Sequence, residues 1–329
     1  MALKPENELH AYQIKAGTIG RKKGHKFEDL LTKEINKLDK FEYEIKDNNH
    51  LYTGNPAKIL LSYIRKKYNL NIESYRAYWL GGLATAGVGD IYLDNDGNPI
   101  KKSKSDVLLK IVLADGSVKN IGVSVKTCSK KTPTNDQIFF TTANAFCNLL
   151  EEHDITVSKE ARKGMEMFCG DVGSRPIDIL DSATLNKRLS DKNRFYWEEL
   201  PKKAYNDLEK IFKNNQDKIT RILFQNAYKD DPFYPEILLH QTVIFDNINN
   251  CQVAIYTMDE IISISHSFSE FTYSKYKIKK GSNKNDPFEH LAPRFGFIQF
   301  QRGGQKQHPT QLQFNLKAGY FNSKIIAPL

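Results

Sequence analysis

The chain has 329 residues, 40% of them hydrophobic, which suits a folded protein with a sizeable core and excludes a disordered chain. Its 48 Lys and Arg outnumber its 39 Asp and Glu, and the formal charge of +9 favours a polyanionic partner such as nucleic acid. The N-terminal MALKPENELH has no apolar core, and no stretch approaches the roughly 18 apolar residues of a membrane span. We therefore expect a cytoplasmic protein.

The first predicted elements are two helices. Apolar residues spaced by three and four, namely Phe27, Leu30, Leu31, Ile35 and Leu38, predict a helix that follows a basic, glycine-rich lead starting at Gly17. The segment NPAKILLSYIRKKYNL predicts a second helix with proline in its first turn. The next stretch, SYRAYWLGGLATAGVGDIYLDNDGNPIKK, contains the glycines and the Asp-Gly pair that are typical of loops and tight turns.

A β-hairpin follows in DVLLKIVLADGSVKNIGVSVKT, where Asp115-Gly116 separates two β-branched runs. Helices are then predicted in TTANAFCNLLEEH and over residues 187–226. Strands are predicted in EILLHQTVIFD, CQVAIYTM, FGFIQFQRG and TQLQFNLKAGYF, and a basic surface loop or ribbon over residues 267–289. This order predicts an α/β fold with a mixed central sheet flanked by helices and with further helical and β additions.

The hairpin places two chemically useful side chains at one end. Asp106 opens its first strand and Lys126 lies near the end of its second, so the turn brings them together. A carboxylate that holds a hard divalent cation, beside an ammonium group that orients or helps to deprotonate a water molecule, suits phosphodiester hydrolysis. Each residue taken alone also has a common structural explanation. An aspartate at the start of a strand is often a turn or cap residue, and a lysine in a strand is often a solvated charge at a sheet edge.

A magnesium ion at this site needs a second acidic ligand, because Mg²⁺ prefers oxygen ligands. The residue two before Lys126 is Ser124, which is not a carboxylate. Glu28, in GHKFEDLL of the first predicted helix, is our candidate for the missing charge. Glu151 and Glu152 are the reserve candidates, and Asp90 is an alternative to Asp106 as first ligand.

These residues resemble the PD-(D/E)XK nuclease superfamily, in particular its type II restriction endonucleases. The resemblance lies in G-x-x-F-E (Gly24, Phe27, Glu28), in SDVLL with Asp106 and in S-V-K (Ser124 to Lys126), and covers mainly residues 20–150. Two positions depart from the pattern: Ser105 replaces proline, and Ser124 replaces the acid. The variant S-V-K motif, with a glutamate recruited from a helix, is similar to that of certain restriction enzymes.

The resemblance implies a restriction-endonuclease-like core, Mg²⁺-dependent cleavage of double-stranded DNA, a homodimer, and a partner methyltransferase that protects host DNA. Its catalytic residues would be Asp106, Lys126, Glu28 and Ser124, with Asp106 and Glu28 as metal ligands. We assign residues 18–175 to the nuclease core and 176–329 to a helical and β-rich part that carries DNA recognition and packs with the core as one unit.

Polar side chains that suit base-edge and phosphate contacts occur in two segments. Gln301, Arg302, Gln305 and Lys306 surround Gly303-Gly304, where the backbone would approach DNA closely, and Lys130 and Lys131 follow the Lys126 strand. The alternative is that these are solvated residues of a hairpin turn and a loop. Two alternatives to a restriction enzyme also stand: a repair or recombination nuclease that recognises DNA structure, and a DNA-binding protein without catalysis.

The cysteine, histidine and glycine patterns argue against other classes. Cys128, Cys147, Cys169 and Cys251 form no CxxC pair or Cys/His cluster, so neither a zinc site nor a disulfide framework is expected. The sequence contains no HExxH, no GxxxxGK[ST] and no GxGxxG in a strand-to-helix setting. These absences argue against zinc hydrolases, ATP-driven translocases and dinucleotide-dependent enzymes.

Overall fold

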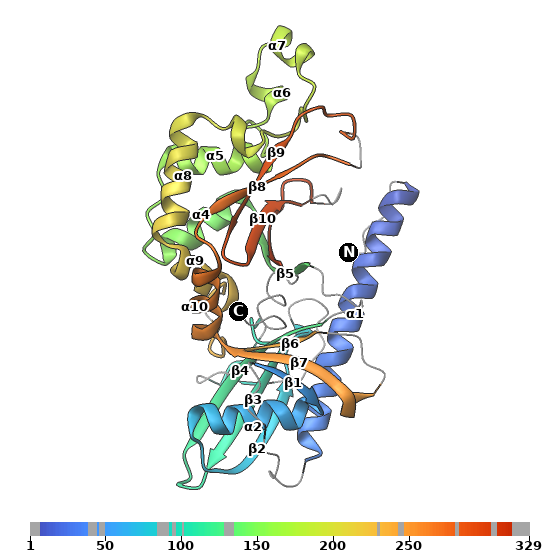
Figure 1. Ribbon diagram of the computed structural model, residues 1–329, viewed down its shortest axis with the longest axis vertical. Coiled ribbons are helices and arrows are strands. Elements are labelled where there is room, and N and C mark those ends of the chain that lie inside the picture. The colour runs from blue at the N-terminus through green and yellow to red at the C-terminus, as the bar shows by residue number, and fades with distance from the viewer. Residues whose placement is uncertain are drawn as a thin grey trace. The chain divides into compact units, whose positions relative to one another are not determined.

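The computed structural model describes residues 7–38, 45, 50–83, 92–93, 97–100, 102–127, 135–228, 231–242, 247–279, 283–303 and 308–317. The chain forms two compact units (Figure 1). The first unit comprises Pro5–Asn135 and Phe224–Ile261, and the second comprises Asp136–Leu223 and Ile262–Lys317. The boundary expected at residues 175 and 176 falls inside the second unit, and the chain passes between the units near residues 135, 223 and 261.

The first unit contains a six-stranded mixed sheet. Its order is β1 (Leu51–Gly54), β7 (Cys251–Thr257), β6 (Pro235–Gln241), β4 (Val118–Lys126), β3 (Val107–Leu113) and β2 (Ile72–Trp79). Strands β4 and β6 are parallel, and the other neighbouring strands are antiparallel. Helices α1 (Glu8–Asn36) and α2 (Pro56–Tyr68) pack on this sheet (Figure 1), so the predicted mixed α/β class is confirmed.

The core of the first unit follows from strand alternation. Val107, Leu109 and Ile111 of β3 are completely buried, as are Leu31 and Ile35 of α1, and all belong to one cluster between helices and sheet. Leu108, which lies between Val107 and Leu109 on β3, faces the other side of the sheet and belongs to a smaller cluster with Leu80, Ile100 and Phe233. The predicted hairpin is present, with Val107 opposite Val123 and with Gly116 in the left-handed conformation (φ +80°) that its tight turn requires.

Two parts of the first unit differ from the prediction. Helix α1 begins at Glu8, so the stretch from Gly17 predicted as a lead is helical, because the apolar residues that follow it hold the helix on the core. The segment SYRAYW, predicted as loop, forms most of β2 because it pairs with β3 over its whole length. Polar residues occupy alternate positions of β2, and its side chains are mostly exposed or only partly buried, so the sequence pattern did not indicate a buried strand.

The second unit contains a five-stranded sheet and most of the remaining helices. Its strand order is β5 (Asn135–Thr141), β11 (Leu312–Lys317), β10 (Ile298–Arg302), β9 (His290–Phe295) and β8 (Thr272–Tyr276). The helices are α4 (Ala143–Glu152), α5 (Lys159–Cys169), α6 (Pro176–Ile179), α7 (Ser182–Lys187), α8 (Lys202–Asn214), α9 (Gln216–Phe224) and α10 (Met258–Phe268), the last two of which begin or end in the first unit. The described chain therefore has two sheets, and the second of them lies in the part for which the sequence predicted helical and β additions to the central sheet. The basic stretch predicted as loop or ribbon contains β8.

Aromatic side chains form the core of the second unit. Trp197 lies in the short 3-10 turn η1 (Trp197–Glu199) and is completely buried, with ring centroids 5.4 Å from both Phe168 and Phe300. Phe212 of α8 stacks on Phe300 at 4.7 Å. Cys147, Cys169 and Cys251 are buried free thiols. In the described part of the chain, no helix has the length and apolar character needed to cross a membrane.

Candidate active site

The hairpin of β3 and β4 fixes Asp106 against the S-V-K segment. The Asp106 backbone N–H donates to Val123 O at 2.9 Å, which puts the aspartate beside Ser124. Its Oδ2 atom accepts hydrogen bonds from the Val125 backbone N–H (2.6 Å) and the Ser124 hydroxyl (3.3 Å). These bonds hold the carboxylate in one orientation, because two successive residues of β4 donate hydrogen bonds to the same oxygen.

Lys126 joins this arrangement from the same strand. Its Nζ lies 3.6 Å from Asp106 Oδ2 and donates to Ser124 Oγ (3.1 Å) and Val125 O (3.2 Å). Ser124 therefore bridges the two charged groups: its hydroxyl accepts from Lys126 and donates to Asp106. The Lys126 side chain is 20% exposed, so the site at this end of the sheet is only partly buried.

Glu28 reaches the same place from α1. It is only 6% exposed, and the Trp79 indole N–H donates to its Oε2 atom at 3.1 Å. Gly81 leaves the space that the two carboxylates occupy: a Cβ on Gly81 would overlap Glu28 Oε2 and lie 3.4 Å from Asp106 Oδ1. The two acids predicted as metal ligands thus lie close together in the space left free because Gly81 has no side chain.

The electrostatics of the pair reflect this closeness. Burial, and then the Asp106 carboxylate, raise the pKa of Glu28 from 4.5 to about 8, while the Trp79 hydrogen bond and Lys126 act in the opposite direction. Ionising two neighbouring carboxylates in a partly buried site costs free energy, because their negative charges repel each other. A proton on Glu28 or a cation between the two groups relieves the repulsion.

The donor set fits a hard divalent cation. Mg²⁺ usually keeps several waters and is bound through one or two carboxylates together with substrate phosphates. Glu28 and Asp106 supply two such oxygen donors, and the Asp106 oxygen nearest Gly81 is Oδ1, not the Oδ2 held by the hairpin. Among the residues that the structure describes, no group of three or more His, Cys, Asp and Glu side chains is arranged to hold a metal ion, so a cation here would depend on this pair, water and phosphate oxygens.

A second lysine borders the site, and the sequence interpretation did not single it out. Burial, and then repulsion from Lys126, lower the pKa of Lys104 from 10.5 to about 7, while Asp106 and Asp231 raise it. Asp231 also fastens the segment before Asp106, because its carboxylate accepts from the backbone N–H of Lys104 (2.5 Å) and the hydroxyl of Ser103 (3.1 Å). Asp231 lies in a segment far along the chain, and no local pattern indicates this contact.

Two of the other candidate acids belong to the second unit. Glu151 and Glu152 belong to α4 of the second unit, where Glu151 forms an ion pair with Arg162 at 2.8 Å. Asp90 lies outside the described residues. Within the described residues of the first unit, Glu28 is the candidate acid that lies beside Asp106.

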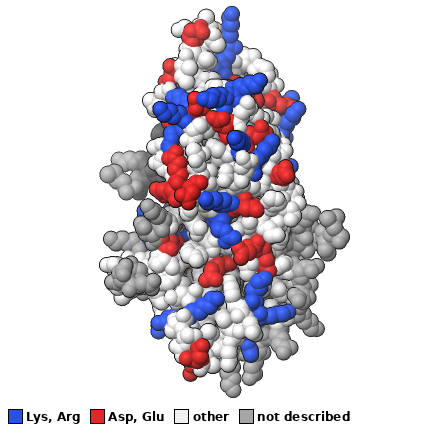
Figure 2. Space-filling view, turned by 90° about the vertical axis from the view of Figure 1, so that its left-hand side faces the viewer, with Lys and Arg blue, Asp and Glu red and all other residues white. Residues whose placement is uncertain are grey.

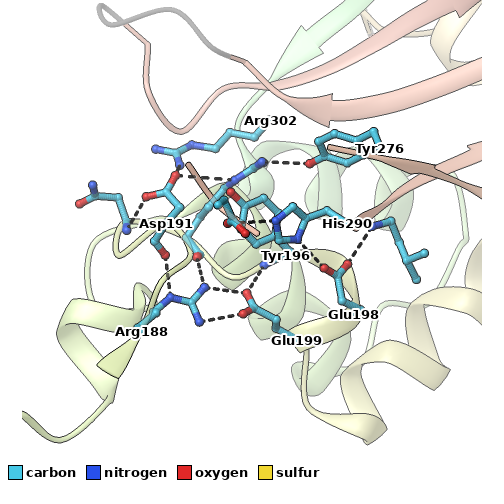
Figure 3. A network of polar contacts seen from close by, with 12 residues as sticks. Arg188, Asp191, Tyr196, Glu198, Glu199, Tyr276, His290 and Arg302 are labelled. Atoms are coloured by element: carbon cyan, nitrogen blue, oxygen red, sulfur yellow. Dashed lines mark hydrogen bonds and ion pairs between the residues drawn. The ribbon is translucent and has the colours of Figure 1, made fainter. Parts of the chain in front are cut away.

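Only part of the predicted DNA-binding set is described. Lys130, Lys131, Gln305 and Lys306 lie outside the described residues. Gln301 is exposed near the end of β10, whereas the Arg302 side chain is only 13% exposed. Arg302 lies 3.3 Å from Asp191 and donates to Pro309 O, inside the polar network of Figure 3. Arg302 thus has protein partners here, and its predicted base contact stays a prediction.

We compared the chain with known protein families, curated proteins and solved structures. No model of a protein family matches the chain, and no curated protein matches it. The chain is similar to the crystal structure of restriction endonuclease MspI in complex with its cognate DNA, with a TM-score of 0.44 and 14% sequence identity over 79% of this chain and 78% of that one. The function proposed below rests on the side chains of the site.

Proposed function

We propose that the protein is a Mg²⁺-dependent nuclease that hydrolyses phosphodiester bonds in double-stranded DNA at a specific sequence, as a type II restriction endonuclease does. The observation that carries this proposal is the meeting of Glu28, Asp106 and Lys126 at one end of the sheet, with Gly81 leaving room between the acids. Two oxygen donors and one ammonium group in a partly buried site suit hydrolysis of a phosphodiester.

The residues have distinct roles in this proposal. Asp106 and Glu28 would hold the cation, which when bound polarises the phosphate and stabilises the charge that develops on it. Lys126 orients the attacking water and takes part in its deprotonation. Ser124 links Lys126 to Asp106 through its hydroxyl, so it keeps the amine beside the acid in a position where related motifs carry a carboxylate.

The wider proposal includes the partners that a restriction enzyme requires. Cleavage of both strands at a symmetric site needs two active sites, which a homodimer supplies. A methyltransferase would protect host DNA. Lys130, Lys131, Gln301, Arg302, Gln305 and Lys306 remain the proposed DNA contacts. On the face drawn in Figure 2, positive and negative side chains are interspersed, so the net charge of +9 does not mark a DNA-binding surface there.

Digestion of a sequenced plasmid with and without Mg²⁺ tests the proposal. We expect discrete fragments that require the metal, and we expect Asp106→Ala and Lys126→Ala each to reduce the cleavage rate by at least about 100-fold while DNA binding is retained. Lys119→Ala is the matched control, because Lys119 lies on the same strand but contacts the Tyr68 ring at 4.1 Å. Unchanged cleavage in both site variants would end the assignment.

The same digestion distinguishes the two alternatives. Cleavage that depends on branched or damaged DNA, without discrete fragments from intact plasmid, would indicate a structure-specific nuclease. Metal-independent binding with no cleavage at all would indicate a DNA-binding protein in which Ser124 marks a lost activity.

A further inference from the structure

We propose that Trp79 is a positioning residue for the Glu28 carboxylate, and that its indole N–H reports directly on cation binding by Glu28 and Asp106. This inference rests on the proposed function, since it assumes that the two acids take up a divalent cation. It assigns a role to a side chain that itself touches neither the cation nor the substrate.

Trp79 and Asp106 are parts of one rigid piece of backbone. Trp79 is the last residue of β2 and pairs with Val107, the neighbour of Asp106. Beyond the strand, the backbone N–H groups of Leu80 and Gly81 both donate to Asp106 O, at 2.9 and 3.0 Å. The backbones of Trp79 and Asp106 are therefore held in a fixed relation to each other.

Glu28 lies on helix α1, which packs against the segment of Trp79 and Asp106 as a separate element. Ala77, two residues before Trp79, is buried in the cluster between sheet and helices, so strand alternation puts Trp79 on the side that α1 covers. The His25 ring, one turn before Glu28 on α1, meets the Trp79 ring edge to face with centroids 6.0 Å apart. The ring contact and the hydrogen bond together fix α1 to the end of β2.

The hydrogen bond determines how the carboxylate faces its partner. Without it, the terminal torsion of a glutamate side chain is free to rotate, because that torsion has broad minima. With Oε2 bound to the indole above Gly81, the carboxylate stays beside Asp106 Oδ1. The indole N–H is a donor without charge or acceptor capacity, so it orients the acid without competing for a cation or adding repulsion.

Loss of this donor should weaken cation binding. Removal of hydrogen-bond partners of metal ligands typically costs about 10- to 100-fold in metal affinity or activity. We therefore expect Trp79→Phe to raise the dissociation constant for Mg²⁺ by about 10- to 100-fold. At saturating Mg²⁺ the cleavage rate should recover, because Glu28, Asp106 and Lys126 are all still present.

The chain offers a direct spectroscopic test, because it contains only two tryptophans, Trp79 and Trp197. Titration of ¹⁵N-labelled protein with Mg²⁺, without DNA, should shift the indole N–H resonance that Trp79→Phe removes and leave the Trp197 resonance in place. Glu28→Gln should abolish the shift. Trp197, buried among aromatic rings of the second unit, is the matched control indole.

The outcomes separate this inference from the proposed function. A wild-type protein that cuts DNA with Mg²⁺ but shows no Trp79 shift, or a folded Trp79→Phe variant with unchanged Mg²⁺ affinity by calorimetry, would overturn the inference alone. A wild-type protein that neither binds Mg²⁺ nor cuts DNA would overturn both. If Trp79→Phe does not fold, the Trp79 resonance is assigned as the one displaced in Glu28→Gln, which changes its hydrogen-bond acceptor, and the titration is still measured on the wild type.

Discussion

Glu28 is a residue whose protonation is linked to folding. Its side chain is 6% exposed and lies beside a second carboxylate, whereas in the unfolded chain it is solvated and alone. The pKa is raised from 4.5 in the unfolded state to about 8 in the folded state. As the pH rises above 4.5 the unfolded chain releases this proton first, so the folded state loses stability through pH 8.

Replacement of Glu28 by glutamine should therefore stabilise the metal-free protein in alkaline solution. At pH 5 the wild type and Glu28→Gln should have similar free energies of unfolding, because the carboxyl is protonated in the folded wild type. At pH 9 the variant should be more stable by roughly 4 kcal/mol. Urea unfolding in the presence of a chelator measures the difference, and a pH-independent difference would contradict this account.

Gly81 is the second residue whose identity the site requires. We expect Gly81→Ala to displace the Glu28 carboxylate, because the added Cβ would occupy the position of Oε2. Cleavage at low Mg²⁺ should fall by at least about 100-fold, while the unfolding free energy should fall by about 1–3 kcal/mol. Circular dichroism and cleavage kinetics measure the two effects.

Gly24 on α1 provides the control for that substitution. A Cβ there would lie 3.6 Å from Glu28 Oε1, which is ordinary contact, and Gly24 lies in the interior of a helix. We expect Gly24→Ala to stabilise the protein by about 0.5–1 kcal/mol and to leave cleavage unchanged. Equal loss of activity in the two alanine variants would show that the space at Gly81 is not what the site requires.

At the scale of elements, a buried polar network joins η1 to β9 within the second unit (Figure 3). His290 is 1% exposed, with Nδ1 2.6 Å from Glu198 and Nε2 3.1 Å from Asp286. The Tyr196 ring stacks on the imidazole at 3.4 Å. One ring thus connects a helical turn, a loop and a strand, and both of its nitrogens have a carboxylate partner.

Removal of the His290 ring should destabilise the second unit without a direct effect on the site chemistry. His290→Leu leaves Glu198 and Asp286 without their shared partner, and we expect a loss of about 3–5 kcal/mol in the free energy of unfolding. The control is His266→Leu, since His266 is 57% exposed and its pair with Asp217 should contribute at most about 1 kcal/mol. Thermal or urea unfolding followed by tryptophan fluorescence measures both, and equal effects would refute the assigned role.

At the scale of the whole molecule, the proposed cleavage of both strands predicts cooperation between two copies. We expect a homodimer in analytical ultracentrifugation, in the presence of cognate DNA if not before. Mixed dimers of wild-type and Asp106→Ala chains should nick plasmid DNA in place of linearising it, because one active site per dimer is lost. Linear product at the wild-type rate from such mixtures would show that a single copy cuts both strands in turn.

The sequence alone was sufficient for elements whose signals are local. The hairpin of β3 and β4 follows from β-branched runs and an Asp-Gly turn, and α2 follows from apolar spacing and a proline in its first turn. Hairpin geometry then places Asp106 and Lys126 at one end without further information. The strand β2 was missed because its polar residues resemble a loop until β3 pairs with it.

Tertiary structure decided which residues complete the site. Trp79 binds Glu28 across 51 positions of sequence, and Asp231 binds the Lys104 backbone across 127. Periodicity and turn residues report on neighbours within a few positions of the chain, whereas these contacts depend on how α1 and the segment before β6 pack against the sheet. The sequence therefore determined the hairpin and its charged pair and offered Glu28 among several candidate acids, whereas packing decided that Glu28, the Trp79 indole and Gly81 lie beside that pair.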